Sequence, residues 1–162
     1  DRLCGKSRPG HFRGVATIVL KLFNVVRPEF AVFGRKDAQQ CVILRKMARE
    51  LDLPVRIVVL PTVRERDGLA LSSRNTLLSS RERLLAPSLY RGLQFVRKSF
   101  RAGKRNDPAV LRAASRIPEG RLEYLSAVDP RSLLPVQTLC RGTLVAAAMR
   151  LGKIRLIDNI LL

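Results

Sequence analysis

The sequence contains no tryptophan, a single histidine, and only 5% aromatic residues in all. With one histidine and no carboxylate pair at metal-ligand spacing, we expect neither a transition-metal site nor a Ser–His hydrolase arrangement. The few aromatic side chains offer no platform for stacking nucleic-acid bases. No window reaches the ~18 consecutive apolar residues of a membrane span, and no secretory signal opens the chain. We therefore expect a soluble, cytoplasmic protein without a membrane partner.

Cysteine is scarce as well. Cys4, Cys41 and Cys140 are an odd number, stand far apart and show no metal-site spacing. Each has an apolar neighbour, which favours three small buried side chains in a reducing compartment. Residue 1 is Asp and not Met, so we expect that another segment preceded it.

Positive charge, by contrast, is abundant. Lysine and arginine number 31 against 13 acidic residues, which gives a net charge of +18. Such a balance raises nucleic-acid binding as a hypothesis. The excess is arginine spread along the whole chain and not a single tract or helix face, which argues against that hypothesis. With 46% apolar and 27% charged residues, the 162-residue chain has the composition of a globular protein with a real core.

The first half of the sequence alternates helical and strand-like segments. An almost wholly apolar run at residues 14–26, ended by Pro28, predicts a buried helix. Residues 30–33 predict an interior parallel strand and residues 55–60 predict a second strand, and between them apolar residues recur at helical spacing from 41 to 51. This order is typical of a right-handed parallel α/β sheet. Two strands are too few for such a sheet, and the missing neighbours fit a lost amino-terminal portion.

From about residue 76 the pattern changes. Ser79 with Glu82 three residues later is a capping box, which predicts a helix towards residue 101 that Pro87 kinks or restarts. Asp107 as N-cap, with Pro108 in the first turn, predicts a second helix to about residue 116. Three strand-like stretches follow, at residues 122–128, 143–149 and 154–159. We thus predict an α/β protein with a first domain at residues 1–75 and a small α+β domain at residues 76–162.

Two polar clusters follow the two predicted strands, at the edge where a parallel sheet places its ligands. The first runs from Gly34 to Gln40. A glycine at a strand end lets the backbone approach a ligand, the next helix offers free N–H groups to an anion, and Lys36 is placed to neutralise phosphate charge. Asp37 as N-cap with Gln40 three residues later is also a capping box. Structural and ligand-binding roles are equally open, and both can hold.

The second cluster, residues 61–75, is a glycine-containing loop with Ser72, Ser73 and Arg74. Two hydroxyls and an arginine can grip triphosphate oxygens and follow charge as it moves during transfer. The run Ser-Ser-Arg-Asn is equally typical of an ordinary turn. The single histidine, His11, lies just before the first predicted helix, where a structural role is the simpler interpretation.

Taken in order, five segments of the sequence resemble the pantothenate synthetases, which are pantoate–β-alanine ligases. The segments are residues 7–15, 33–40, 61–65, 67–75 and 155–159. The resemblance covers nearly the whole chain, and it implies part of a nucleotidylyltransferase-type Rossmann domain with a parallel sheet, followed by a small α+β domain that closes over the site in a homodimer. It also implies a two-step ligase. ATP and pantoate, with Mg²⁺, give pantoyl adenylate and pyrophosphate, and the β-alanine amine then releases AMP and pantothenate.

The resemblance also implies roles for individual residues. The implied ATP site is lined by Gly34, Arg35, Lys36 and Asp37 and by Val63, Leu71, Ser72, Ser73 and Arg74. Lys36 would lie on the phosphates, the Val63 backbone would hold the nucleotide, and Gln40 would hydrogen-bond pantoate. Catalysis is implied for Lys36, Ser72, Ser73 and Arg74, since the reaction needs positioning and charge stabilisation more than a protein nucleophile.

The sequence departs from the family pattern in three ways. The amino-terminal segment with two histidines that steady the triphosphate is absent, Arg35 stands where glutamate is usual, and Ala38 replaces a usual aromatic residue. Three hypotheses follow. The chain is part of a working ligase, or it is an inactive fragment or degenerate homologue that keeps the fold and nucleotide binding, or it is a basic nucleic-acid-binding module.

Overall fold

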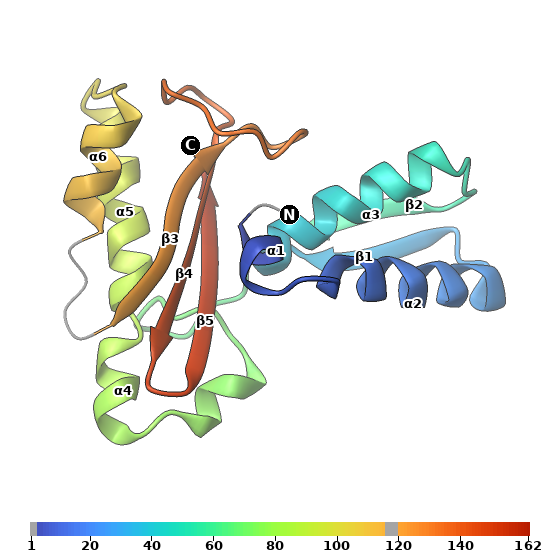
Figure 1. Ribbon diagram of the computed structural model, residues 1–162, viewed down its shortest axis with the longest axis horizontal. Helices are drawn as coiled ribbons and strands as arrows, with labels where there is room; N and C mark the ends of the chain where they lie inside the picture. The colour runs from blue at the N-terminus through green and yellow to red at the C-terminus, as the bar shows by residue number, and fades with distance from the viewer. Residues whose placement is uncertain (1–2, 116–119) are drawn as a thin grey trace. The chain divides into compact units, whose positions relative to one another are not determined.

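The chain divides at Pro61 into two units, Asp1–Pro61 and Thr62–Leu162 (Figure 1). The computed structural model describes residues 3–115 and 120–162. The division falls ahead of the boundary expected after residue 75, because residues 62–75 pack with the second unit through an ion pair between Arg64 and Asp158. Within the described ranges, no helix has the length and apolar character needed to cross a membrane.

The amino-terminal unit is an α/β arrangement, as predicted, but its first strand is not interior as expected, since no residue of either strand is buried. Its helices are α1 (Cys4–Ser7), α2 (His11–Val26) and α3 (Ala38–Glu50), and a short 3₁₀ turn, η1 (Arg35–Asp37), precedes α3. Strand β1 (Phe30–Gly34) pairs in parallel with β2 (Arg56–Leu60), in a register that sets Phe30 opposite Arg56 and Gly34 opposite Leu60. Helix α3 is therefore the crossover between two parallel strands.

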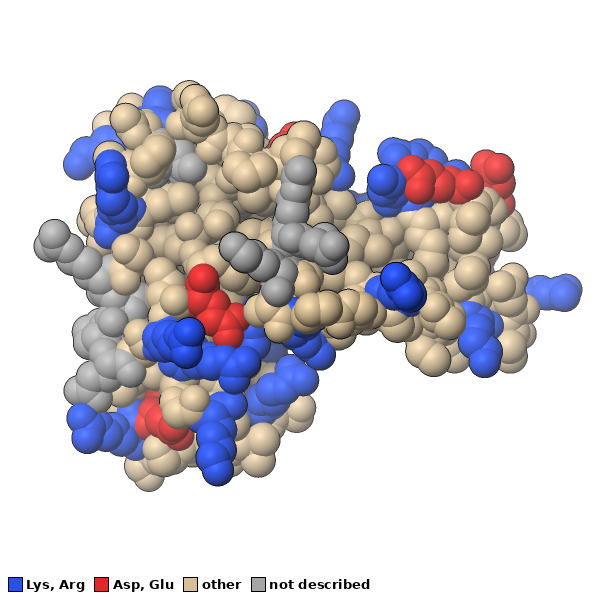
Figure 2. Space-filling model, viewed as in Figure 1, with Lys and Arg blue, Asp and Glu red and all other residues tan. Residues whose placement is uncertain are grey.

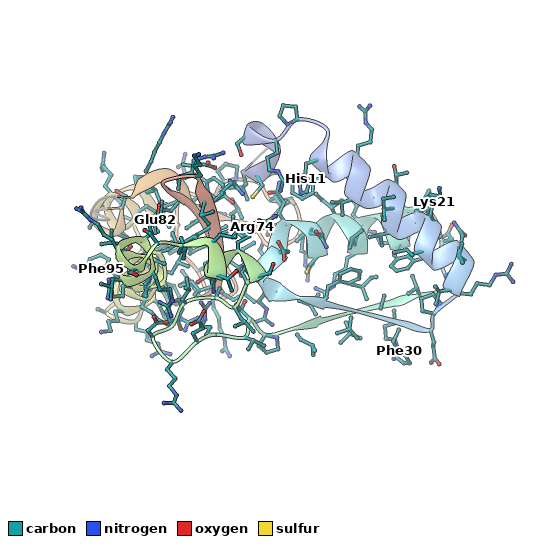
Figure 3. The ribbon with its side chains drawn as sticks, turned by 90° about the horizontal axis from the view of Figure 1, so that it is seen from below. His11, Lys21, Phe30, Arg74, Glu82 and Phe95 are labelled. Atoms are coloured by element: carbon teal, nitrogen blue, oxygen red, sulfur yellow. The ribbon has the colours of Figure 1, made fainter. Side chains whose placement is uncertain are left out.

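Helix α2 forms where it was predicted and ends before Pro28. Its burial was predicted wrongly, since among its residues only Phe23 is buried, and Val25 is 81% exposed. The helix is apolar almost all round, but one face alone packs against α3. In Figure 3, Phe30 points away from the two helices, and it is 48% exposed, so the other face of the β1–β2 sheet is open in the described chain.

Helix α3 confirms the predicted periodicity. Cys41, Leu44 and Ala48 are buried on one stripe of the helix. Leu51, which was expected on the same stripe, is 52% exposed because the helix ends at Glu50 and Leu51 is its C-cap. Cys4 and Cys41 are buried as expected, whereas Cys140 is exposed, so the prediction of three buried cysteines is wrong for Cys140.

The carboxyl-terminal unit is a three-stranded antiparallel sheet with helices. Its strands are β3 (Arg121–Val128), β4 (Leu144–Leu151) and β5 (Ile154–Leu161), with β4 in the centre. Its helices are α4 (Ser80–Leu85), α5 (Ser88–Arg101) and α6 (Asp107–Ala114), and α5 packs against β4, β5 and α6. The side chains buried most completely include Leu93, Val96, Leu139, Val145 and Met149. The small α+β architecture and its three strands are as predicted.

The helix signals of this second unit were interpreted correctly with one exception. Ser79 and Glu82 form the predicted capping box at the start of α4, and the chain restarts as α5 directly after Pro87. The N-cap of α6 is Asn106 and not Asp107, because the Asn106 Oδ1 accepts a hydrogen bond from the backbone N–H of Ala109 at 3.3 Å. The end of this helix predicted at residue 116 lies outside the described residues.

Candidate functional site

The end of β1 carries a glycine that the fold does not require. Gly34 has φ −80° and ψ 134°, which any residue can adopt. A Cβ built on it would meet no heavy atom of the described chain within 4 Å. Neither its backbone conformation nor its packing in the described chain explains a glycine, and the space beside this strand end is open. Close approach by a ligand or by another segment would explain it.

The polar residues after Gly34 lie in η1 and in the first turn of α3. Arg35, Lys36 and Gln40 are half-buried, and Asp37 is exposed. Asp37 is the N-cap of α3 but, within the described structure, its side chain makes no capping hydrogen bond. The predicted capping box of Asp37 and Gln40 is therefore not formed, because ψ of 52° at Asp37 departs from the extended backbone usual at an N-cap.

Two neighbouring side chains tie this turn to the rest of the unit. The Gln39 Oε1 accepts a hydrogen bond from the backbone N–H of Cys4 at 3.1 Å, which holds α1 against the start of α3. The Cys41 thiol donates to the carbonyl oxygen of Gly34 at 3.5 Å. Burial, followed by the charge of Asp37, raises the pKa of the Cys41 thiol, so the thiol keeps the proton that it donates. This hydrogen bond fixes the end of β1 against the first turn of α3.

His11 stands at the first residue of α2 (Figure 3). Its Nε2 lies 3.1 Å from a guanidinium nitrogen of Arg8, which donates the hydrogen bond, and its ring lies 5.0 Å from that of Phe12. These contacts are local to the segment between α1 and α2. They agree with a structural role.

Residues 62–75 form a tight hairpin at the start of the second unit. Arg64 lies opposite Ala70, and the backbone N–H of Leu71 donates to the Val63 carbonyl oxygen at 3.0 Å. Gly68 turns the chain with φ +92°, a conformation that favours glycine. An added Cβ at Gly68 would lie 2.5 Å from Cδ1 of Tyr90, so the turn also needs a residue without a side chain.

A buried arginine anchors the hairpin. The two terminal nitrogens of Arg64 contact the Asp158 carboxylate of β5 at 2.5 and 2.9 Å, a bidentate ion pair whose side chains are 18% and 3% exposed. Arg64 also donates to the Gly68 carbonyl oxygen at 3.0 Å, and its guanidinium carbon lies 3.8 Å from the Tyr90 ring centroid. One side chain therefore joins the hairpin to its own turn, to α5 and to β5.

A second arginine joins the hairpin to α4. Arg83 contacts Glu65 at 2.6 Å and Asp67 at 2.5 Å. Hydrogen bonds from Asn75 and from Arg83 lower the pKa of the Glu65 carboxyl, and the hydrogen bond from Arg83 lowers the pKa of Asp67. Both carboxylates are thus stabilised in the charged form that binds Arg83.

Beyond this anchored hairpin the chain presents a short polar loop. Ser72 caps the 3₁₀ turn η2 (Ser73–Leu77), and its hydroxyl accepts a hydrogen bond from the backbone N–H of Arg74 at 3.3 Å. Ser73 and Arg74 are exposed, and so are Leu71 and Val63 at 56% and 67%. The hairpin pairing brings the predicted residues of this segment into one local structure. The residues of the strand-end segment belong to the other unit.

The residues that hold the loop were not predicted from the sequence. Arg64, Glu65, Asp67 and Asp158 stood inside the segments that carry the family resemblance, but no role was assigned to them, and Arg83 stood outside those segments. Alternating charge at residues 64–67 was the available signal. It could not name the partners, because Arg64 and Asp158 are 94 residues apart.

Several carboxylates of the second unit form ion pairs with arginines. Among its described carboxylates, Glu65, Asp67, Glu123 and Asp158 each contact an arginine. Figure 2 shows Lys and Arg side chains dispersed over the visible surface of both units, with the fewer acidic side chains beside basic ones. Among the described residues, no group of three or more His, Cys, Asp or Glu side chains could hold a metal ion.

Comparisons with known proteins agree on one family. The family model for pantoate-beta-alanine ligase matches residues 1–161. A pantothenate synthetase of Herpetosiphon aurantiacus is 48% identical over 98% of this chain and 59% of that protein. The crystal structure of the Thermus thermophilus pantothenate synthetase matches with a TM-score of 0.94 at 46% identity, again over 98% of this chain and 59% of the other.

A more distant structure carries ligands. The pantoate-beta-alanine ligase of Francisella tularensis, solved in complex with beta-gamma ATP and beta-alanine, matches with a TM-score of 0.73 at 33% identity, over 98% of this chain and 53% of that one. The chain thus spans somewhat more than half the length of the relatives it matches.

Proposed function

The chain belongs to the pantoate–β-alanine ligase family, and from that membership we propose that it is part of an ATP-dependent ligase that condenses pantoate with β-alanine. The proposed reaction has two steps. The pantoate carboxylate attacks the α-phosphorus of ATP, which forms pantoyl adenylate and releases pyrophosphate. The β-alanine amine then attacks the acyl carbon, and AMP leaves as pantothenate forms.

The proposed role of the strand-end segment is to bind ATP and pantoate. Gly34, Arg35, Lys36 and Asp37 would line the nucleotide, with the Lys36 ammonium on the phosphates, where it stabilises charge that grows as pyrophosphate departs. Gln40, half-buried on α3, would hydrogen-bond pantoate. The open space beside Gly34 supports this assignment, since nothing in the described chain fills it.

The proposed role of the hairpin loop is to grip the phosphates. The Val63 backbone would hold the nucleotide, and Leu71, Ser72, Ser73 and Arg74 would contact phosphate oxygens. The observation that supports this role best is that one set of residues in this segment holds its structure while another set is exposed. The ion pairs that hold the hairpin involve Arg64, Glu65 and Asp67. At the end of the hairpin, Ser73 and Arg74 are exposed.

Mg²⁺ belongs to the proposed reaction as the ion that accompanies ATP. Magnesium usually keeps several waters and binds through substrate phosphates and one or two carboxylates. The exposed Asp37 fits as one such carboxylate, and bound Mg²⁺ would neutralise phosphate charge. A homodimer and a cytoplasmic location are further parts of the proposal that follow from the family resemblance.

The test is pantoate-dependent exchange of pyrophosphate into ATP, which isolates the first step. The assay compares this chain with a chain extended at its amino terminus by the corresponding part of the Thermus thermophilus enzyme. Exchange in the extended chain that disappears without pantoate is the expected result. No exchange in either form would refute the proposed activity and leave the inactive homologue, for which Arg35→Glu in the extended chain is the next variant to assay.

A further inference from the structure

We propose that Asn75 is a positioning residue that fixes the phosphate-gripping loop through its side-chain amide. The loop's role in this inference rests on the proposed function. Asn75 follows Arg74 directly in the chain and is 9% exposed. No role was assigned to it on sequence, where it closed an ordinary turn motif.

The Asn75 amide reaches both strands of the hairpin. Its Nδ2 donates to Oε1 of Glu65 at 2.8 Å and to the carbonyl oxygen of Ala70 at 3.2 Å. Both partners are pure acceptors, so the orientation of the amide is fixed: the nitrogen must face them. Its backbone N–H donates to the Ser72 carbonyl oxygen at 3.0 Å. Asn75 thereby joins the two ends of the loop, one residue away from Arg74.

The partner of Asn75 is itself held firmly. The second carboxylate oxygen of Glu65 accepts from Arg83 at 2.6 Å, and Arg83 also binds Asp67 at 2.5 Å. A continuous path of hydrogen bonds thus runs from the loop through Asn75 and Glu65 to α4. A network of this kind restricts motion more than its separate bonds would.

The remaining atom of the amide, Oδ1, makes no such contact within the described chain. The Asn75 Oδ1 is buried and has no hydrogen-bond partner among the described residues. A buried acceptor left unsatisfied is costly to stability. The Asn75 side chain therefore acts on the loop through its two Nδ2 donors. The placement of the Arg74 backbone is what those two donors secure.

The inference predicts a local effect. Asn75→Ala removes both donors, and Asn75→Asp removes them while keeping the size of the side chain. Either change should raise the hydrogen–deuterium exchange rates of the backbone amides at Leu71, Arg74 and position 75 by about tenfold or more. Amides in β4 should be unaffected. The measurement needs this chain alone.

Asn106→Ala is the matched control. It removes the hydrogen bond that the backbone N–H of Ala109 donates to an asparagine side chain in the same unit, and it should raise exchange only in the first turn of α6. Loop exchange within about twofold of wild type in both Asn75 variants, or an equal increase in the control, would overturn the inference.

A kinetic measurement tests the consequence for the reaction. In the extended chain, Asn75→Ala should lower kcat for ATP–pyrophosphate exchange about tenfold to a hundredfold and leave the KM for pantoate within about twofold. A loss confined to the KM for pantoate would contradict the assignment. If the extended wild type shows no exchange, the proposed function fails, while the amide-exchange result still decides whether Asn75 holds the loop.

Discussion

The ion pair between Arg64 and Asp158 offers the sharpest test of how the hairpin is held. Asp158→Ala removes a carboxylate that is 3% exposed and leaves the Arg64 guanidinium, 18% exposed, without its anionic partner. Arg64 keeps the Gly68 carbonyl oxygen and the face of Tyr90. Neither of these partners carries a compensating negative charge.

The expected loss of unfolding free energy in Asp158→Ala is large for a single substitution. Removing one member of a buried pair typically costs about 3–5 kcal/mol, because the other charge stays buried. Because Arg64 keeps two other contacts, we expect Asp158→Ala to cost an amount in the lower half of that range. Asp158→Asn keeps one acceptor oxygen, so we expect about half of the effect. The double variant Arg64→Met with Asp158→Leu buries no charge, and we expect it to be more stable than Asp158→Ala.

Tyrosine fluorescence can follow the unfolding of the second unit. It has no tryptophan, and both of its tyrosines, Tyr90 and Tyr124, lie in the second unit. Urea unfolding followed by tyrosine fluorescence therefore reports on the free energy of unfolding of that unit. Lys153→Ala, at an exposed residue of the β4–β5 turn, is the control and should change it by less than about 0.5 kcal/mol. An Asp158→Ala cost below about 1 kcal/mol, or a double variant less stable than the single one, would refute the reasoning.

Three further predictions can be checked independently. In the extended chain, Lys36→Ala should slow ATP–pyrophosphate exchange by about a hundredfold or more with a much smaller change in pantoate binding, since the role proposed for Lys36 is to stabilise developing phosphate charge. Equal losses in both would refute that assignment. Gly68→Ala should lower the urea midpoint more than Gly142→Ala, because both residues have positive φ but only the first would clash with Tyr90. Burial raises the pKa of Glu123, yet hydrogen bonds from two arginines outweigh it and leave that pKa lowered. Its stabilising contribution is therefore complete above the unfolded pKa and lost as pH falls through the folded pKa, so Glu123→Gln should flatten the dependence of unfolding free energy on pH below about 4.3.

Local signals in the sequence were sufficient for most of the fold. The capping box at Ser79 and the restart after Pro87 depend on residues a few positions apart, and the structure confirms both. The α6 cap was assigned one residue late, because Asn106 and Asp107 are both good caps and only the backbone geometry decides between them. The burial of α2 was misjudged because an apolar sequence does not say whether a partner surface lies within the same chain.

Residues of the loop could be singled out on sequence as candidates for the site, whereas the residues that hold the loop could not. Ser72 and Arg74 could be singled out by chemistry alone, since hydroxyls and a cation suit phosphate. The hydrogen bond from Asn75 to Glu65 and the ion pair from Arg64 to Asp158 arise from tertiary contact. No regular sequence spacing links the partners of either interaction, so neither interaction could be predicted from the sequence.

The anchoring of the hairpin by Arg64 changes what can be concluded from sequences of this family. In a copy of the gene that had lost its activity, a single change at Arg64, Gly68 or Asp158 would still destabilise the protein, so selection for stability would act against it. Ser73 and Arg74 are exposed in the described structure and carry no such constraint. In a drifting homologue these two residues should therefore change first. On the role proposed for them, their presence in a sequence says more about retained catalysis than the longer match that surrounds them.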